Sequence, residues 1–314
     1  MQLTPVKIGK YQTPNNVFLA PLAGYTNFPF RKLALYYGAG LAFTEMISAK
    51  GLHYGNENTE KMLYTTDEEP LKAVQLFGHE PQILREACES EELRAFQIVD
   101  INMGCPMPKI TGNGEGSALL TDRRLAAKIV EECKKSGKAV TVKMRIGLTD
   151  DSLIGVPFAR AMEEAGADLI TVHGRSRERI YAGEPNFEEI ARIKQAVNIP
   201  VIANGGIDGV QKAEEMIEKT GADGVAIARA AMYDPQIFCD FTGMPREGKK
   251  EMIFRQLSDM GRVFDEHFTT VYMRKMAVFY LKGERGVSAW KERLFACKSV
   301  QEIKKTVEEI FPTE

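Results

Sequence analysis

Short apolar segments rich in β-branched residues alternate with longer amphipathic segments, and this alternation limits the possible folds more than any other feature. The pattern predicts strands at 17–20, 41–44, 72–77, 97–102, 139–144, 168–172, 199–203 and 222–227. Between them it predicts helices at 27–37, 81–90, 117–136, 154–165, 186–197 and 209–219. Such alternation is typical of βαβ units, which build parallel sheets. Eight units in about 230 residues predict an α/β fold of the (β/α)8 TIM-barrel type.

Two predicted helices end in the same way. Gly166 and Gly221 each precede Ala-Asp and the next strand, in "AGADLITV" and "TGADGVAI". Glycine at this position adopts the left-handed conformation without steric cost, so it is a common helix stop. These two joints support the predicted positions of the sixth and eighth strands.

The last quarter of the chain has a different pattern. The segment "TGMPREGKK" marks a boundary, and residues 251–313 show helical periodicity with no strand signal. We therefore expect a barrel domain at 1–243, followed by a small all-helical C-terminal domain at 244–314. Residues 246–314 hold 14 Lys+Arg and 11 Asp+Glu, whereas the preceding residues hold 27 and 32. The positive balance fits either scattered solvated charge on packed helices or a surface for an anionic partner.

Composition excludes several classes of protein. The chain is 44% hydrophobic and 27% charged, which is typical of a globular protein, and its net charge of −2 argues against a polycation that coats nucleic acid. The five cysteines form no CxxC pair, so we expect neither a disulfide framework nor a metal site. Without a signal sequence or a long apolar run, we expect a cytoplasmic protein with no membrane contact and no obligatory protein partner.

Polar side chains and glycines follow nearly every predicted strand. In a barrel the carboxyl ends of the strands meet on one face, where barrel enzymes carry their chemistry. We therefore predict one binding site on this rim. The residues at these ends include Pro21, Leu22, Ala23, Gln75, Asn102, Cys105, Lys143, Arg145, His173, Arg175, Asn204, Gly205, Gly206, Ala228 and Arg229.

The last two strand ends suggest a phosphate site. Asn204, Gly205 and Gly206 follow the seventh strand, and Arg229 follows the eighth. Barrels commonly bind phosphate between these two loops, through backbone N–H groups and a cation. A tight turn would explain the glycine pair equally well, but the nearby arginine favours phosphate.

The other strand ends suit a flat heterocycle. Gln75 and Asn102 offer amide donors and acceptors that match the imide edge of a flavin or a pyrimidine. Lys143 lies in an apolar strand and needs either an internal ion pair or a ligand. Cys105, in a Gly-Cys-Pro turn, is either a proton donor or packing. His173 is either structural, a phosphate ligand or a proton donor.

An ordered set of motifs carries a family resemblance. The motifs are "APLAGYTNFPFR", "VQLFG", "DINMGCP", "VKMRIG", "TVHGRSR", "IPVIANGGI" and, in the tail, "YMRKMAVFYLKG". Together they resemble the tRNA-dihydrouridine synthases over nearly the whole chain. The resemblance implies an FMN-binding barrel and a helical tRNA-binding domain. It also implies that the C5=C6 bond of particular tRNA uridines is reduced, with NADPH or NADH recharging the flavin.

The resemblance also assigns roles to residues. It implies that Cys105 is the proton donor and that Asn102 lies near the substrate uracil. Further tRNA contacts are expected from Lys109, Arg145, Arg175 and Arg177 on the rim, and from Arg274, Lys275 and Lys282 in the tail. The residues implied to hold FMN are Pro21, Leu22, Ala23, Gln75, Lys143, His173, Asn204, Gly205, Gly206, Ala228 and Arg229.

Some motifs depart from the common family pattern, and two alternatives stay open. Asn204-Gly205-Gly206 and Ala228-Arg229 stand where many relatives have Asn-Gly-Asp and Gly-Arg. A dihydroorotate dehydrogenase-like flavoprotein would share the barrel and the Cys-Pro loop, although it would not need a basic tail. A tRNA-binding module without flavin would not need Cys105 or Lys143.

Overall fold

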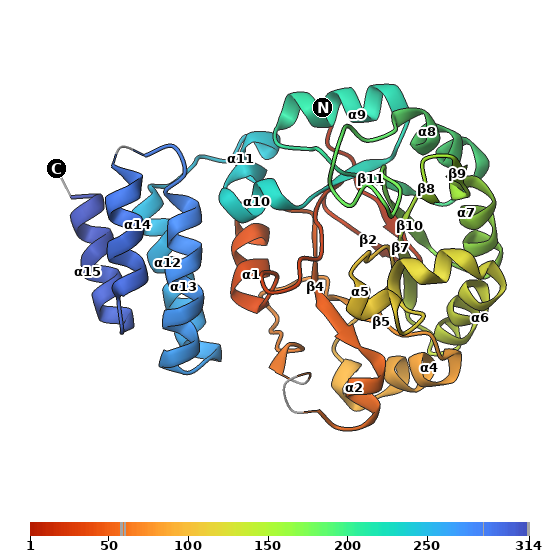
Figure 1. Cartoon of the computed structure of the whole chain (residues 1–314), viewed down its shortest axis with the longest axis horizontal. Coiled ribbons are helices and arrows are strands. Elements are labelled where there is room, and N and C mark those ends of the chain that lie inside the picture. Colours follow the sequence, from red (N-terminus) through yellow and green to blue (C-terminus); the bar gives the residue numbers. More distant parts are fainter. Residues whose placement is uncertain (57–58, 60, 285, 313–314) are drawn as a thin grey trace.

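Eight parallel strands close into a barrel. The computed structural model describes residues 1–56, 59, 61–284 and 286–312. The strands pair in the order β10-β11-β12-β3-β4-β5-β6-β7, and β7 pairs with β10 to complete the ring. Each predicted strand overlaps one of them, so the predicted barrel is confirmed (Figure 1). The strands are β3 (Val17–Leu19), β4 (Leu41–Ser48), β5 (Ala73–Phe77), β6 (Ile98–Met103), β7 (Ala139–Arg145), β10 (Leu169–His173), β11 (Val201–Asn204) and β12 (Gly224–Ile227).

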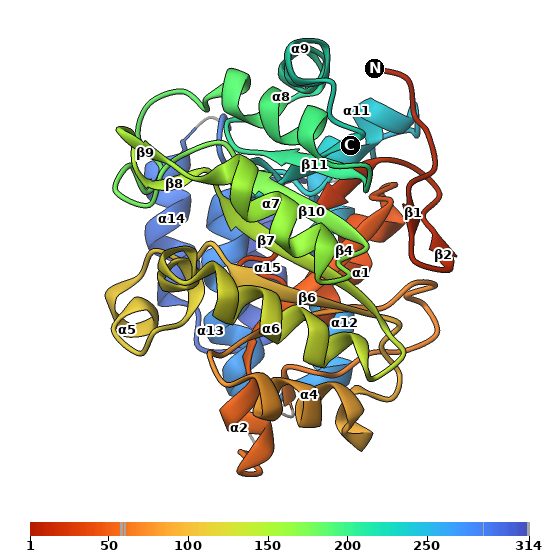
Figure 2. The same ribbon diagram turned by 90° about the vertical axis from the view of Figure 1, so that its right-hand side faces the viewer.

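Helices cover the outside of the barrel, as predicted, and α6, α7 and α8 lie over the face seen in Figure 2. One predicted helix, at 117–136, is divided: a 3-10 segment at Gly116–Thr121 precedes the α-helix. The division falls at Asp122, whose side chain accepts a hydrogen bond from Leu125 N and so starts a new helix. The helices are α1 (Phe28–Tyr36), α2 (Ala49–His53), α4 (Pro81–Glu89), α6 (Arg123–Lys134), α7 (Gly155–Glu164), α8 (Phe187–Ala196) and α9 (Val210–Thr220).

The predicted helix stops are also present. Gly221 ends α9 with φ +67°, and Gly166 follows α7 with φ +98°. Both lie in the region of positive φ that glycine adopts at no steric cost. Each turn returns the chain directly to the next barrel strand.

A short hairpin that the sequence pattern did not reveal closes the amino end of the barrel. Its strands are β1 (Lys7–Ile8) and β2 (Tyr11–Gln12). Val6 and Ile8 are buried in the cluster that fills the barrel interior, with Phe18, Ile98, Leu169 and their neighbours. With this end filled by apolar side chains, the polar carboxyl end is the face on which a ligand can enter.

In the described part of the chain, four helices at the C-terminal end form a separate lobe, drawn in blue in Figure 1. They are α12 (Lys249–Val263), α13 (Glu266–Tyr280), α14 (Val287–Ala296) and α15 (Val300–Ile310). Two short helices, α10 (Arg229–Tyr233) and α11 (Ile237–Thr242), precede them, and Gly243 ends α11 in the left-handed conformation. We propose the boundary between the two domains at 243/244.

The lobe is fastened to the barrel through α1 and the loop before it. Buried apolar residues of α1 and α12 belong to one continuous cluster. The ammonium of Lys32 lies 2.8 Å from Asp259 Oδ1, and the hydroxyl of Tyr272 donates to the carbonyl of Tyr25 at 2.8 Å. Within the described ranges, no helix is both long and apolar enough to cross a membrane.

Candidate active site

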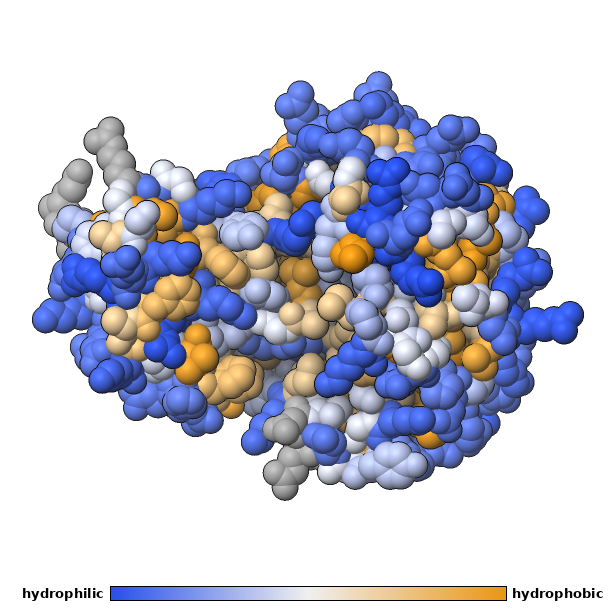
Figure 3. Space-filling view, in the orientation of Figure 1, coloured by the Kyte–Doolittle hydropathy of each residue, from blue (hydrophilic) through white to orange (hydrophobic). Residues whose placement is uncertain are grey.

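A cavity of about 1170 Å³ opens at the carboxyl end of the barrel and reaches the helical lobe. Figure 3 shows the surface hollowed between the two lobes. Met252, Tyr280 and Lys282 contribute walls from the helical side. Most of the sequence-predicted site residues line it. They are Pro21, Leu22, Ala23, Gln75, Asn102, Cys105, Lys109, Lys143, Arg145, His173, Arg175, Asn204, Gly205, Gly206, Ala228, Arg229 and Lys282.

A chain of hydrogen bonds links the side chains on three neighbouring strands. Asp100 on β6 accepts from Gln75 Nε2 on β5 at 2.6 Å and from Thr141 Oγ1 on β7 at 2.6 Å. Gln75 Oε1 accepts from Asn102 Nδ2 at 2.8 Å. The register places Gln75, Asp100 and Thr141 side by side across the three strands. The amides that line the cavity are therefore supported from beneath by a buried carboxylate.

Cys105 lies in a tight loop directly after β6. Its backbone N–H donates to Asn102 Oδ1 at 2.9 Å, and its carbonyl accepts from Ser117 N at 3.0 Å and Ser117 Oγ at 2.8 Å. A Cβ at Gly116 would lie 2.8 Å from the Cys105 carbonyl oxygen, so only glycine fits there. Burial raises the pKa of the Cys105 thiol, which keeps it protonated at neutral pH. The thiol is thus able to donate a proton into the cavity.

The other cysteines do not compete for this role. Cys88, Cys133, Cys239 and Cys297 are buried, whereas Cys105 is partly exposed in the cavity. In the described part of the chain, no group of three or more His, Cys, Asp or Glu side chains has the arrangement of a metal site.

Lys143, on β7, lines the cavity. Burial, with the nearby Arg145 charge, lowers its pKa from 10.5 to about 8, although Asp100 partly offsets this. Among the described residues, its ammonium makes no hydrogen bond, so it is available to a ligand oxygen or nitrogen. Asp100 attracts this ammonium at longer range, without a close ion pair among the described residues.

Replacing Lys143 with methionine should stabilise the ligand-free protein at pH 7 by on the order of 1–3 kcal/mol, because an ammonium no longer has to be buried. The lysine has a pKa of about 8 in the folded chain and 10.5 in the unfolded chain. Between these values the unfolded chain binds the proton more tightly, so the stability of the unaltered protein rises with pH. The advantage of the variant should shrink across this window. Urea unfolding near pH 7 and pH 10 measures it, and an equal difference at both values would contradict the argument.

The opposite side of the cavity has the features of an anion site. Gly205 and Gly206 have φ of +117° and +72°, and a Cβ at Gly205 would lie 2.8 Å from His173 Cδ2 and 3.0 Å from Arg175 Nη1. Backbone N–H groups in such a turn can approach a phosphate closely. Arg229 adds a cation beside them, and its guanidinium lies 4.8 Å from the ring centroid of Tyr181.

His173 is uncharged in this corner. Burial and the surrounding cations lower its pKa well below the usual value of 6.5. Arg175 Nη1 lies 3.2 Å from His173 Nε2, and because a guanidinium can only donate, this nitrogen accepts and Nδ1 carries the proton. A neutral imidazole positions groups here and does not supply charge.

Several predicted tRNA contacts have partners within the protein. Arg145 donates to the carbonyls of Gly104, Ser176 and Ile180 at 2.8–2.9 Å, and Arg175 donates to Ala182 and Gly183. These two side chains position loops. Arg177 donates its backbone N–H to Gly147 and is not among the described lining residues.

The tail residues separate into two groups. Arg274 donates to the carbonyls of Phe295 and Cys297 at the end of α14, within the helical lobe. Lys275 instead reaches the barrel rim, 3.3 Å from the Gly24 carbonyl and 4.0 Å from the ring centroid of Tyr25. Lys282 lines the cavity, 4.8 Å from the Tyr233 ring. Arg285, three residues after Lys282, lies outside the described residues.

Two elements of the site were missed from the sequence. The first is Asp100. It alternates with apolar residues two positions before Asn102, so the period of two could have placed both side chains inside the barrel. Tyr181 has no comparable signal: it follows Ile180, which has a φ of +50° that is unusual for a β-branched residue. Hydrogen bonds from Arg145 and Arg175 hold this loop in place.

Solved structures match the barrel fold at low sequence identity. A mutant of morphinone reductase in complex with tetrahydroNAD superposes with a TM-score of 0.56 at 16% identity, and the match covers 77% of this chain and 91% of that one. An old yellow enzyme homologue from Zymomonas mobilis gives 0.58 at 12% identity, with 79% and 94% covered. At such identities the likeness shows the barrel fold alone.

Sequence comparison is more specific. The dihydrouridine synthase (Dus) family model matches residues 18–314. tRNA-dihydrouridine synthase B of Pseudomonas aeruginosa is 37% identical over 290 residues, 89% of this chain and 87% of that protein. tRNA-dihydrouridine synthase B of Pseudomonas putida is 35% identical over 312 residues, 95% and 92%. With a family match that spans both the barrel and the helical lobe, the chain belongs to the dihydrouridine synthase family.

Proposed function

We propose that this protein reduces the C5=C6 bond of particular uridines in tRNA to dihydrouridine, with FMN in the barrel and NADPH or NADH as the electron donor. The observation that carries the proposal is one cavity in which a protonated thiol, two oriented amides and a lysine face a glycine-arginine anion site. The relatives named above are tRNA-dihydrouridine synthases, and their name describes the same activity.

The residues present fit FMN. A side chain at Gly205 would clash with His173 and Arg175, so the bare backbone of this turn would face the phosphate, and Arg229 would supply a cation. Gln75 would hydrogen-bond the pyrimidine part of the flavin, and the Lys143 ammonium would face its N1 and O2 side. Ala23 would lie along the ring together with its neighbours Pro21 and Leu22, while His173, Asn204 and Ala228 would complete the phosphate end.

The bound flavin would supply the hydride for C6 of the uracil. The remaining work falls to this chain. Asn102, whose amide is held by Gln75, would orient the uracil ring. Cys105 would give its proton to C5 from the side opposite the hydride, and general acids of this kind contribute about 10²–10⁴-fold. The uridine must leave its stack to reach the cavity, which costs least in a tRNA loop.

The helical lobe would contact the tRNA backbone while the barrel receives the base. Lys275 and Lys282 fit this role because Lys275 reaches the barrel rim and Lys282 lines the cavity. Contacts to phosphates position a nucleic acid without reading its sequence.

Replacing Lys275 and Lys282 with alanine should weaken tRNA binding and lower the salt slope by about 0.7–0.9 per lost phosphate contact. FMN content should not change. Arg274→Ala is the matched control: it removes a cation from the same helix, but its partners are the carbonyls that end α14. It should lower stability by about 1 kcal/mol and leave the salt slope unchanged. Filter binding across a salt series measures this, and a larger effect of the control would contradict it.

The function is tested with the purified chain and with cells that lack it. The protein should be yellow or take up FMN, and tRNA from the deletion strain should lack dihydrouridine at specific positions. Uridine-containing tRNA should stimulate NADPH oxidation by the purified enzyme. Stimulation by a free dihydroorotate-type substrate and not by tRNA would favour the alternative flavoprotein. A colourless protein that cannot be reconstituted would favour a binding module.

A further inference from the structure

A buried carboxylate beneath the cavity has no role in the proposed chemistry. Asp100 is 1% exposed and does not line the cavity, although three neighbours, Gln75, Asn102 and Lys143, do. Both of its oxygens accept 2.6 Å hydrogen bonds, one from Gln75 and one from Thr141. An acid placed so deep is costly, so its presence calls for a reason.

The carboxylate imposes a direction on the hydrogen bonds above it. An ionised carboxylate can only accept, so Gln75 must turn its NH2 group toward Asp100. Gln75 Oε1 then faces Asn102 and can only accept, so Asn102 Nδ2 donates to it at 2.8 Å. Asn102 Oδ1 is thereby turned to the backbone N–H groups of Gly104 and Cys105, at 3.2 and 2.9 Å. An amide in place of Asp100 could meet Gln75 with either end and would impose no direction.

The pKa of Asp100 stays below neutral pH despite its burial. Burial raises its pKa from 3.8 to about 6, and this is opposed by the bonds from Thr141 and Gln75 and by the Lys143 charge. Lys143 lies beside Asn102 in the register between β6 and β7, one inward-facing position above Thr141. The carboxylate and the ammonium thus occupy adjacent layers of the barrel wall.

We propose that Asp100 is a positioning residue: its carboxylate sets which atoms of Gln75 and Asn102 face the cavity and, through Asn102, anchors the loop of Cys105. Its role toward the flavin rests on the proposed function, whereas its hold on the Cys105 loop does not. The first test is therefore a titration of the full-length ligand-free protein with FMN. Asp100→Asn should weaken FMN binding by about 10-fold or more, the scale expected for a hydrogen bond to a charged group.

Thr141→Val is the matched control for this titration. It removes the other hydrogen bond to the same carboxylate but leaves the one that orients Gln75. The Thr141 bond also lowers the pKa of Asp100, so the titrations are run at pH 9, where the carboxylate stays ionised without it. FMN affinity should then stay within roughly threefold of the unaltered protein, since only a bond beneath the network is lost. Equal losses in Asp100→Asn and Thr141→Val would show that the carboxylate is merely a packed polar group and would overturn the proposal.

A second readout needs no flavin. Cys105 is the cysteine exposed to the cavity, so iodoacetamide should label it selectively in the folded protein. Asp100→Asn should speed this alkylation by about fivefold, because the loop loses one oriented hydrogen bond and the thiol becomes less buried. If that variant does not fold, Gln75→Met replaces it. This change removes the hydrogen bonds from Gln75 to Asp100 and from Asn102 to Gln75, and it keeps the bond between Asp100 and Thr141. It should raise the rate equally.

The exchanged pair Asp100→Asn/Gln75→Glu supplies the decisive rescue. The carboxylate introduced at position 75 would accept from Asn102 just as the Gln75 amide does, and the amide introduced at position 100 would donate to that carboxylate. Asn102 would therefore regain its direction. Alkylation should return to roughly the unaltered rate, while FMN binding should remain weak because a carboxylate now faces the flavin.

Two results of this series would overturn the proposal. One is an unchanged alkylation rate in both single variants, and the other is the absence of rescue in the exchanged pair. An unaltered protein that binds no FMN would instead refute the proposed function, and the alkylation series would still test Asp100.

Discussion

Cys105→Ala should slow dihydrouridine formation by about 10²–10⁴-fold while the bound flavin is still reduced by NADPH at its normal rate. The thiol lies in the cavity, protonated because burial raises its pKa, and its loop is fixed by Asn102 and Ser117. Removing the proton donor affects only the step in which the uracil takes up a proton. Stopped-flow measurement of flavin reduction, followed by reoxidation with tRNA, separates the two half-reactions.

Cys133→Ala is the control for this experiment. That thiol is buried between helices and does not line the cavity. Cys133→Ala should change the free energy of unfolding without altering the ratio between the rates of flavin reduction and of reoxidation by tRNA. Reoxidation by tRNA at the unaltered rate in Cys105→Ala would mean that the thiol only packs, and another acid on the rim would then have to protonate C5.

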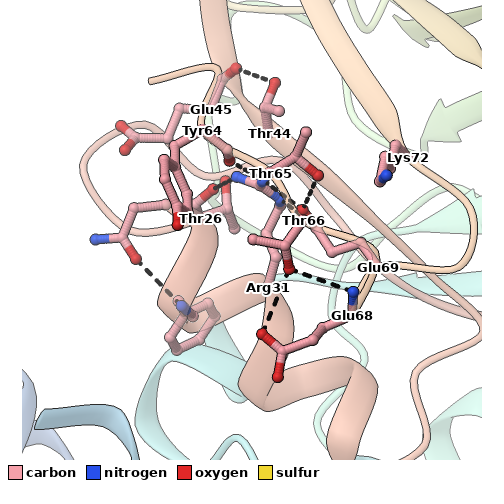
Figure 4. Close-up of polar contacts among 12 residues, drawn as sticks. Thr26, Arg31, Thr44, Glu45, Tyr64, Thr65, Thr66, Glu68, Glu69 and Lys72 are labelled. Atoms are coloured by element: carbon pink, nitrogen blue, oxygen red, sulfur yellow. Dashed lines mark hydrogen bonds and ion pairs between the residues drawn. The ribbon is translucent and has the colours of Figure 1, made fainter. Parts of the chain in front are cut away.

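Glu69→Ala should destabilise the fold by about 3–5 kcal/mol, because it leaves the buried Arg31 guanidinium without its counter-charge. The two side chains are 1% and 2% exposed and form two hydrogen bonds of 2.8 Å (Figure 4). Thr65 Oγ1 donates to the same carboxylate at 2.7 Å, and Arg31 also donates to the carbonyls of Thr26 and Tyr64. The pair therefore holds segment 64–69 against α1 and against the loop at Thr26 that precedes this helix.

Glu68 provides a control one residue away. It also pairs with a cation, Lys32, at 2.8 Å, but its side chain is 44% exposed. Glu68→Ala should cost no more than about 1 kcal/mol, since water screens exposed pairs. The double variant Arg31→Met/Glu69→Leu should cost far less than the two single changes combined. Urea unfolding measures all three, and equal effects of Glu68→Ala and Glu69→Ala would contradict the assignment.

The barrel could be predicted from the sequence because its determinants are local. A strand buried on both faces is a short apolar run whatever its neighbours are, and a helix stop such as Gly221 is set by its own φ. The same reasoning located the cavity, since the strands of a parallel barrel end on one face. The family was also identified correctly, because its motifs follow these strand ends in order.

The direction of individual side chains could not be predicted. Arginine is a common phosphate ligand, and the sequence predicted Arg145 and Arg274 as tRNA contacts. In the structure both side chains donate to backbone carbonyls of segments that are distant in the sequence. The role of Asp100 could not be predicted because it depends on hydrogen bonds from Gln75 and Thr141, which lie on two other strands. The hairpin of β1 and β2 is likewise too short to carry a periodic signal.

The sequence by itself therefore determined the alternation of elements, the closed barrel, the helical lobe and the set of residues at the carboxyl end of the barrel. Only the tertiary structure decided which of those residues are free to meet a ligand. The physical reason is that hydrophobic periodicity is set by the geometry of a single helix or strand. The partner of a buried charge or amide, by contrast, depends on the strands and loops that packing brings beside it.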